Sequence, residues 1–335
     1  MTYYTGESVA EFLTVAGCAV EFVEMVKAPQ LLQYHFNFKK LKDFKALKNA
    51  LLMLQYKTRQ EVTEAPSTRA HFSIIMKRDE RETFHILQQG ETMRKAAPLS
   101  VLLGKDTNGE IITARIADLP HLLIAGTTGS GKSCALNSFI TSLACYNKPQ
   151  SLGFIMFDLK QTELTTFNEL PHLEAPTITD ADEAAPMFRA LVREMRSRYE
   201  EIKKGASPDD FKTLVIIIDE LADLVTQCPE VKPHLIELLA KARAANIFLI
   251  VATQSPRAKV LDGATLANLP SRLALTCASS RESVLILGHK GAENLTGAGD
   301  AIIKLNGSTQ EKRIQCPYIS KEQIKILINK SKTGK

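Results

Sequence analysis

Residues 126–133 form a glycine-rich segment that ends in Lys132 and Ser133, with the spacing G-x-x-x-x-G-K-[ST] of a phosphate-binding loop. Its glycines let the backbone curl so that successive N–H groups point at phosphate oxygens. Lys132 brings positive charge to the β and γ phosphates, and the Ser133 hydroxyl is a ligand for Mg²⁺. The sequence therefore predicts a site for ATP and Mg²⁺ lined by Gly126, Thr127, Thr128, Gly129, Ser130, Gly131, Lys132, Ser133 and Cys134.

An acidic pair, Asp219 and Glu220, directly follows the apolar run 214–218. An acidic residue at the end of a strand that is apolar on both faces lies where a parallel sheet presents side chains to a ligand. We expect Asp219 to hold Mg²⁺ through a water molecule. We expect Glu220 to polarise the water that attacks the phosphate, which is work that carboxylates commonly do. Asp223, one helical turn later, is expected to have a structural or capping role.

A nucleotide site alone does not define a class of protein. The chain contains neither the L-S-G-G-Q segment of ATP-binding-cassette proteins nor the N-K-x-D segment with which GTPases recognise guanine. The remaining class is that of the additional-strand ATPases with a RecA-like fold, which includes helicases, packaging motors and DNA pumps.

Within that class, residues from about 98 to 319 resemble the motor of the FtsK/SpoIIIE DNA translocases. The resemblance covers roughly two-thirds of the chain, in the order of the family's motifs. Its segments are 103–106, 119–126, 128–133, 154–160, 170–173, 218–224, 241–245, 252–254, 269–272, 291–293 and 297–300. The resemblance implies a hexameric ring of identical subunits that threads double-stranded DNA and hydrolyses ATP between neighbouring subunits.

The resemblance also assigns catalytic roles beside those of Lys132 and Glu220. Arg243, in Lys-Ala-Arg-Ala-Ala, matches the arginine finger that one subunit inserts into the site of the next, where it neutralises charge on the transferring phosphoryl group. Arg272 is a second basic candidate for the same interface. Gln254 resembles the polar residue that senses the γ phosphate.

For DNA contacts, the family uses a loop after Ala-Thr-Gln and a second near Ser-Ser-Lys. A motor that runs over any sequence needs contacts with phosphates, so basic and hydroxyl side chains suffice. In this chain these positions predict Thr253, Arg257, Lys259 and Arg281 as DNA-binding residues. The chain departs from the family at Ser255, where many relatives carry Arg.

The elements that must position these residues follow from the hydrophobic pattern. Short apolar runs alternate with longer amphipathic stretches, which predicts an α/β fold with a central, mostly parallel sheet. The predicted strands are 122–125, 153–157, 214–218, 248–252 and 272–276, and the predicted helices are 132–145, 184–204 and 231–245. Asp180 or Asp182 caps the second helix, and Pro186 fits its first turn.

We expect three parts along the 335 residues: a small N-terminal α+β domain at 1–96, the RecA-like motor at 97–320, and a C-terminal helix with a polar tail at 321–335. The first part, which includes a Lys-rich segment at 39–48, faintly resembles the small α domain that precedes the motor in the family, chiefly over 40–54 and the lead-in 98–106. Residues 1–35 resemble nothing that we can place. Six cysteines without C-x-x-C pairs indicate small buried residues in a reducing compartment.

Composition is consistent with a cytoplasmic protein. Hydrophobic residues make up 44%, the formal net charge is +5, and the sequence has no apolar run long enough to cross a bilayer. The family's membrane-spanning segment, linker and winged helix have no counterpart, which favours a soluble motor of a mobile element. Three alternatives stay open: a conjugation or DNA-packaging motor, a RecA-like helicase, and a nucleotide-dependent switch protein with little turnover.

Overall fold

The computed structural model describes residues 4–29, 31–40, 43–60, 62–65, 71–77 and 82–333, and these form two compact units. The smaller unit groups the residues up to Thr83 with Lys105–Ile111, and the larger unit holds Phe84–Gly104 and Ile112–Lys335. Residues 84–96 therefore group with the larger unit, although the sequence analysis assigned them to the N-terminal domain. Residues 41 and 42 of the Lys-rich segment, and 334 and 335 of the polar tail, lie outside the described residues.

The smaller unit is an α+β structure in which two helices pack on an antiparallel sheet of strand order β1-β2-β4-β3. Its core combines apolar residues of both helices with those of alternate strand positions, including Leu13, Leu54 and Ile74. Phe36 and Phe72 stack at this core with ring centroids 5.3 Å apart. The elements are α1 (Gly6–Val15), β1 (Val20–Lys27), β2 (Leu31–Phe38), α2 (Asp43–Thr58), β3 (Thr63–Ala65) and β4 (His71–Lys77).

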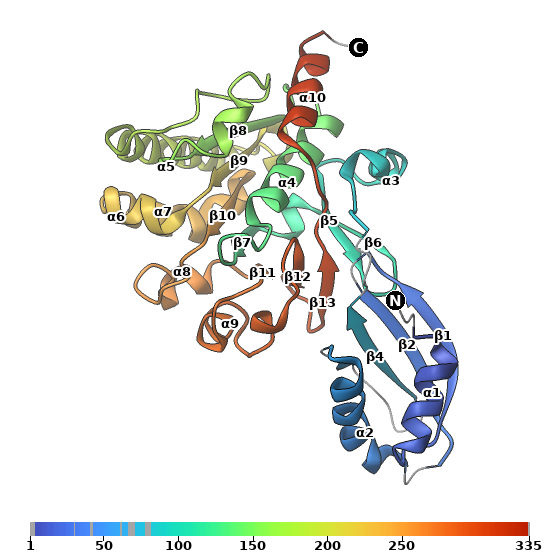
Figure 1. The fold of residues 1–335 in the computed structure, drawn as a ribbon. Helices are drawn as coiled ribbons and strands as arrows, with labels where there is room; N and C mark the ends of the chain where they lie inside the picture. Colours follow the sequence, from blue (N-terminus) through green and yellow to red (C-terminus); the bar gives the residue numbers. More distant parts are fainter. Residues whose placement is uncertain are drawn as a thin grey trace. The chain divides into compact units, whose positions relative to one another are not determined.

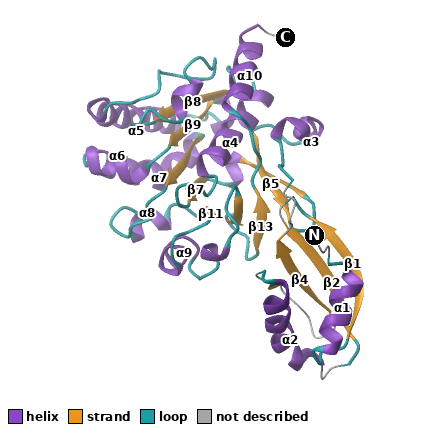
Figure 2. Cartoon of the chain, viewed as in Figure 1, coloured by secondary structure: helices purple, strands orange, loops and turns teal. Residues whose placement is uncertain are grey.

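The larger unit is built on a nine-stranded sheet, counted over the described residues, with helices on both faces (Figures 1 and 2). Its strands are β5 (Ser100–Asp106), β6 (Ile111–Arg115), β7 (His121–Ala125), β8 (Leu152–Phe157), β9 (Thr213–Ile218), β10 (Ile247–Thr253), β11 (Ser271–Leu275), β12 (Asp300–Lys304) and β13 (Glu311–Gln315).

The α-helices of the larger unit are α3 (Gly90–Lys95), α4 (Lys132–Tyr146), α5 (Ala181–Lys203), α6 (Leu221–Gln227), α7 (Val231–Lys241), α8 (Gly263–Ala267), α9 (Ser280–Leu287) and α10 (Lys321–Thr333). Short 3₁₀ segments are η1 (Ile86–Gln89), η2 (Ile116–Asp118), η3 (Leu164–Phe167), η4 (Pro208–Asp210), η5 (Ala242–Ala245) and η6 (Ala292–Asn294).

The strand order β6-β5-β13-β12-β11-β7-β10-β9-β8 places five parallel strands, β11, β7, β10, β9 and β8, side by side. β10 lies between β7 and β9, so one strand separates the strand before the phosphate loop from the strand before the acidic pair. β12 and β13 extend the sheet in antiparallel fashion. The predicted α/β class with a mostly parallel sheet is therefore confirmed, and the smaller unit has the expected α+β character.

Alternate residues of the parallel strands face two different helical layers, as expected for strands with period two. Leu123, Ile216 and Leu249 belong to one cluster with the apolar faces of α5, α6 and α7. α4 is buried along nearly its whole length, because it contacts β7 and also α3 and α10. This double covering explains why the strand runs are apolar throughout.

Two details differ from the sequence prediction. α5 begins at Ala181 behind the N-cap Asp180, so Pro186 lies in the second turn and not in the first. Proline has no backbone N–H, so Pro186 leaves one carbonyl of the exposed first turn without its helical hydrogen-bond donor. The helix predicted at 231–245 changes to 3₁₀ geometry after Lys241. No helix among the described residues is both long and apolar enough to cross a membrane.

Candidate nucleotide site

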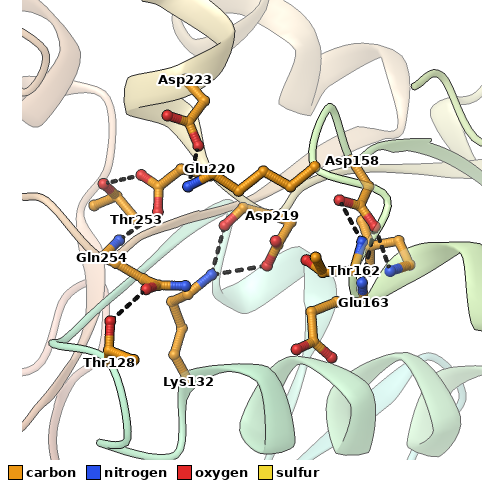
Figure 3. Close-up of polar contacts among 12 residues, drawn as sticks. Thr128, Lys132, Asp158, Thr162, Glu163, Asp219, Glu220, Asp223, Thr253 and Gln254 are labelled. Atoms are coloured by element: carbon orange, nitrogen blue, oxygen red, sulfur yellow. Dashed lines mark hydrogen bonds and ion pairs between the residues drawn. The ribbon is translucent and has the colours of Figure 1, made fainter. Parts of the chain in front are cut away.

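The candidate site lies where the carboxyl ends of the five parallel strands meet. The phosphate loop follows β7, Asp158 follows β8, Asp219 and Glu220 follow β9, and Gln254 follows β10. Parallel strands end at a common edge, so segments that are distant in sequence converge there. Figure 3 shows Lys132, Asp219, Glu220 and Gln254 close together, whereas the Asp158 carboxylate faces the turn that follows it.

The phosphate loop is held on both sides by the strands next to β7. Gly126 donates its N–H to the Thr253 carbonyl over 3.2 Å, and Thr127 donates to the Thr276 carbonyl over 2.9 Å. Gly131, the N-cap of α4, has a φ of 103°. A Cβ added there would lie only 2.4 Å from the Gly299 nitrogen, which leaves room for glycine alone.

The turn that precedes β12 packs under the loop. Gly299 donates its N–H to the Ser130 carbonyl over 2.7 Å. Asp300, 2% exposed, accepts two hydrogen bonds from Arg313 at 3.0 and 2.7 Å, which ties this turn to β13. The motif segment 297–300 therefore contacts the phosphate loop and stabilises its conformation.

Lys132 and Asp219 form a buried ion pair. The ammonium group lies 2.7 Å from Asp219 Oδ1 and donates also to the Asp219 carbonyl over 2.6 Å. Only 3% of the lysine side chain and 4% of the aspartate side chain are exposed. Two such charges are stable in the interior only because each compensates the other.

Glu220 does not point into open space. Its Oε1 accepts hydrogen bonds from the Thr253 hydroxyl over 2.6 Å and from the Ala222 N–H over 3.3 Å. Its Oε2 accepts from the Gln254 N–H over 2.7 Å. The carboxylate that was expected to activate water is therefore engaged with protein donors (Figure 3).

Gln254 connects the end of β10 with the phosphate loop. Its side-chain oxygen accepts a hydrogen bond from the Thr128 hydroxyl over 2.8 Å. The same residue thus contacts Glu220 through its backbone and the loop through its side chain. Its role as a sensor of the γ phosphate stays a prediction.

A second charged pair lines the site. Lys160, after β8, lies 2.6 Å from Asp223 on α6, and this hydrogen bond raises the pKa of Lys160, with smaller contributions from Glu220 and Asp219. Asp158 is 1% exposed and accepts backbone N–H groups of the following turn, including Leu164 at 2.9 Å. Asp158 therefore shapes the turn that carries Lys160.

Arg243 lies near the amino end of β10, the end opposite to the phosphate loop. It is exposed on η5, immediately before β10, whereas Gln254 follows the end of the same strand. A strand of this length spans roughly 20 Å, so Arg243 does not reach the phosphate loop of its own chain. Arg272 donates from all three guanidinium nitrogens to the carbonyls of 266, 269 and 286, which gives it a structural role instead of the interface role considered for it.

The predicted DNA contacts divide into two groups. Arg257, Lys259 and Arg281 are exposed, on the loop after β10 and in the first turn of α9. Thr253 is different from the expectation: it is 0% exposed and its hydroxyl is bonded to Glu220, so it contacts the site and no outside ligand. Its place at the end of an uninterrupted apolar run was the signal for burial.

The remaining predicted residues lie where the motif requires. Ser133 is half-buried in the first turn of α4. Cys134 is also half-buried, and burial raises the pKa of its thiol. The structural roles of Thr253 and Lys160 were missed by the sequence analysis. No cluster of three or more His, Cys, Asp or Glu side chains suited to a metal occurs in the described part of the chain.

Solved structures share this fold. The pCW3 conjugation coupling protein TcpA matches with a TM-score of 0.68 at 20% identity, over 98% of this chain and 99% of that one. The type VII secretion ATPase EccC of Thermomonospora curvata matches with a TM-score of 0.62 at 24% identity, over 70% of this chain and 31% of that one. Fold and site together define a RecA-like P-loop ATPase.

Sequence comparison is more specific. Residues 84–209 match the model of the FtsK/SpoIIIE family. The chain is 39% identical over 266 residues to the DNA translocase FtsK of Leptospira interrogans, covering 74% of this chain and 28% of the relative. It is 40% identical over 243 residues to that of Caldanaerobacter subterraneus, covering 69% and 34%. The chain belongs to the FtsK/SpoIIIE family, and it spans about a third of the length of these relatives.

Proposed function

We propose that this chain hydrolyses ATP and uses the energy to translocate double-stranded DNA, working in a ring of identical subunits with sites at subunit interfaces. One observation carries the proposal. The phosphate loop, the Lys132–Asp219 pair and Glu220 meet at the carboxyl ends of the parallel strands, and the exposed basic loops begin at the same ends. A nucleotide-driven change at this edge acts directly on those loops.

The residues present fit ATP with Mg²⁺. The Ser133 hydroxyl and the Asp219 carboxylate are hard oxygen donors of the kind that Mg²⁺ prefers. Ser130 Oγ is buried in the loop and has no hydrogen-bond partner among the residues that the structure describes, so the loop retains an unused polar group. Mg²⁺ supplies charge neutralisation at the phosphates when bound. In this proposal Lys132 would hold the phosphate oxygens, and Ser133 and Asp219 would hold the metal.

Assembly into a ring is supported by the position of Arg243. An exposed arginine at the edge opposite to its own phosphate loop is suited to the site of a neighbouring subunit. Such an arginine contributes roughly 10³–10⁵ in rate in related enzymes. An arginine that enters the site of the next subunit requires a head-to-tail contact between subunits. Repeated contacts of this kind form a closed ring when the successive rotations return to the first subunit. A hexamer is the closure that the family resemblance favours.

The exposed cations Arg257, Lys259 and Arg281 are proposed to contact the phosphates of the duplex. Contacts of this type are independent of sequence, as a motor requires, and weaken with salt because they release counterions. DNA affinity is therefore expected to fall steeply as the salt concentration rises.

The test is steady-state ATPase with and without linear duplex DNA, followed by displacement of a third strand from a triplex. We expect duplex to stimulate turnover and triplex displacement to require ATP, with Lys132→Ala as the inactive control. Unwinding of a forked duplex without triplex displacement would favour a helicase. Turnover that duplex does not change would favour a switch protein, and capture of a relaxase or portal protein would favour a conjugation or packaging motor.

A further inference from the structure

The carboxylate of Glu220 accepts three hydrogen bonds from its own chain and is 9% exposed. An ionised carboxylate offers about four lone-pair sites, so three are occupied. A general base must direct a lone pair at the water whose proton it takes. In this arrangement little of the hydrogen-bonding capacity of Glu220 is free, and its orientation is set by Thr253, Gln254 and Ala222.

Thr253 joins this carboxylate to the beginning of the loop after β10. The Thr253 hydroxyl donates to Glu220 Oε1 over 2.6 Å and accepts the Ser255 N–H over 3.2 Å. The N–H of the intervening residue, Gln254, donates to Glu220 Oε2 over 2.7 Å. Hydrogen bonds to an ionised group are roughly twice as strong as neutral ones, so both bonds resist reorientation of Glu220.

We infer that the Thr253 hydroxyl and the Gln254 amide form a latch that holds Glu220 in a resting orientation, and that movement of the loop 254–262 releases it. The inference rests on the proposed function. It makes Thr253 a positioning residue that suppresses turnover until the loop is engaged by DNA. The loop needs only a small shift, because displacing Gln254 breaks one of the bonds directly and displaces the partner of the other.

The Gln254 side chain connects the latch to the nucleotide as well. Its oxygen accepts from the Thr128 hydroxyl of the phosphate loop over 2.8 Å. Nucleotide in the loop and DNA on 254–262 therefore act on the same short segment. Release of Glu220 then depends on both ligands, which limits hydrolysis in the absence of DNA.

The test is Thr253→Val, which keeps the shape of the side chain and removes its hydroxyl. We expect ATPase activity without DNA to rise by about tenfold or more, as follows from losing one hydrogen bond to a charged group, and the stimulation by duplex to shrink by the same factor. Thr253→Ser keeps the donor and is expected to retain the wild-type ratio of stimulated to unstimulated rates.

Thr213→Val is the matched control. Thr213 is also a buried strand threonine, 2% exposed, with its hydroxyl bonded to Asn246 Oδ1 over 3.2 Å, but it lies at the other end of the sheet. Its loss should leave the ratio of rates unchanged. Thermal unfolding and binding of a fluorescent ATP analogue, recorded for each variant, separate a latch effect from misfolding.

An unchanged or lower DNA-independent rate in a folded Thr253→Val protein would overturn the latch while leaving the proposed function intact. If that variant does not fold, amide exchange of the wild type decides: Ala222 and Gln254, both donors to Glu220, should exchange faster with duplex and a slowly hydrolysed ATP analogue bound. Unchanged exchange would overturn the latch. Absence of turnover in all variants with and without duplex would overturn the proposed function and the latch together.

Discussion

Lys132 Nζ lies 2.7 Å from Asp219 Oδ1 in an interior that leaves only 3% and 4% of the two side chains exposed. The two groups proposed to hold phosphate and Mg²⁺ therefore compensate each other's charge. This pairing avoids the cost of a buried, unpaired charge.

Lys132→Ala is expected to abolish ATP turnover and also to destabilise the fold by about 3 to 5 kcal/mol, because Asp219 is left buried without its partner. Urea unfolding measures this change. Lys203→Ala is the control, since Lys203 forms an ion pair of the same 2.7 Å length with Glu200 but with both side chains more than half exposed. Its removal should barely change stability. Combining Lys132→Met with Asp219→Asn should recover stability without activity; no recovery would argue against an electrostatic cause.

Gly131→Ala is expected to cost about 3 kcal/mol, because an alanine meets the backbone of Gly299 and must also adopt a φ of 103°. Gly205→Ala separates the two causes. Gly205 has a φ of 109° but no atom within 4 Å of an added Cβ, so only conformational strain of about 1 kcal/mol applies. The loss of unfolding free energy is measured without nucleotide. Equal losses in the two variants would contradict a close contact between 297–300 and the phosphate loop.

Arg243→Ala is expected to lower the ATPase rate by about 10³-fold or more if the arginine acts in the neighbour's site. Mixing this variant in equal amounts with Glu220→Gln should restore activity at about a quarter of the interfaces, those that combine two intact partners. Arg193→Ala, which removes an exposed arginine from α5, should leave the rate near that of the wild type. Failure of the mixture to recover any activity would contradict a role between subunits.

His121 makes stability depend on pH. Its ring is 3% exposed and Nδ1 accepts the Leu249 N–H over 3.0 Å. Burial, aided by the charge of Arg243, lowers the pKa of His121 to about 4 from its usual 6.5. Between these two values the unfolded chain binds the proton more readily, so stability present at neutral pH is lost as the pH falls from about 6.5 to 4, by about 3 kcal/mol.

His121→Asn tests this, since the amide oxygen can accept the Leu249 N–H without titrating. The variant should show a smaller loss of unfolding free energy between neutral pH and about pH 4 than the wild type. Burial also lowers the pKa of His172, so the difference between the two proteins is the informative quantity. Parallel pH profiles would contradict the assignment to His121.

The central part of the fold could be predicted from the sequence because its signals are strong. The apolar run before the glycine-rich loop and the one before Asp219 indicate buried strands, and the loop itself is a recognisable phosphate-binding motif. β12 and β13 escaped prediction, since their alternating pattern is short and half exposed. For the smaller unit, only the α+β character could be predicted. Antiparallel pairing, such as that of Phe36 with Phe72, depends on contacts between residues that are distant in sequence.

Within the site, residue types predicted what each group can do but not which partner holds it. The orientation of Glu220 follows from the hydroxyl of Thr253, and two strands must be aligned before that contact exists. The motif placed Thr253 among the DNA contacts, although its strand buries it. The apolar run before Thr253 indicates its burial, but only the alignment of β9 with β10 identifies Glu220 as its partner.

β10 begins next to Arg243 and ends at the Thr253–Gln254 pair, and its backbone is bonded along both sides to β7 and β9. A strand held in this way behaves as a stiff rod, since close-packed interiors transmit strain instead of absorbing it. A displacement at the Arg243 end of β10 is therefore expected to be transmitted to the Thr253–Gln254 end. In the proposed ring, β10 would therefore couple the contact that Arg243 makes with a neighbouring subunit to the residues that hold Glu220 in its own subunit.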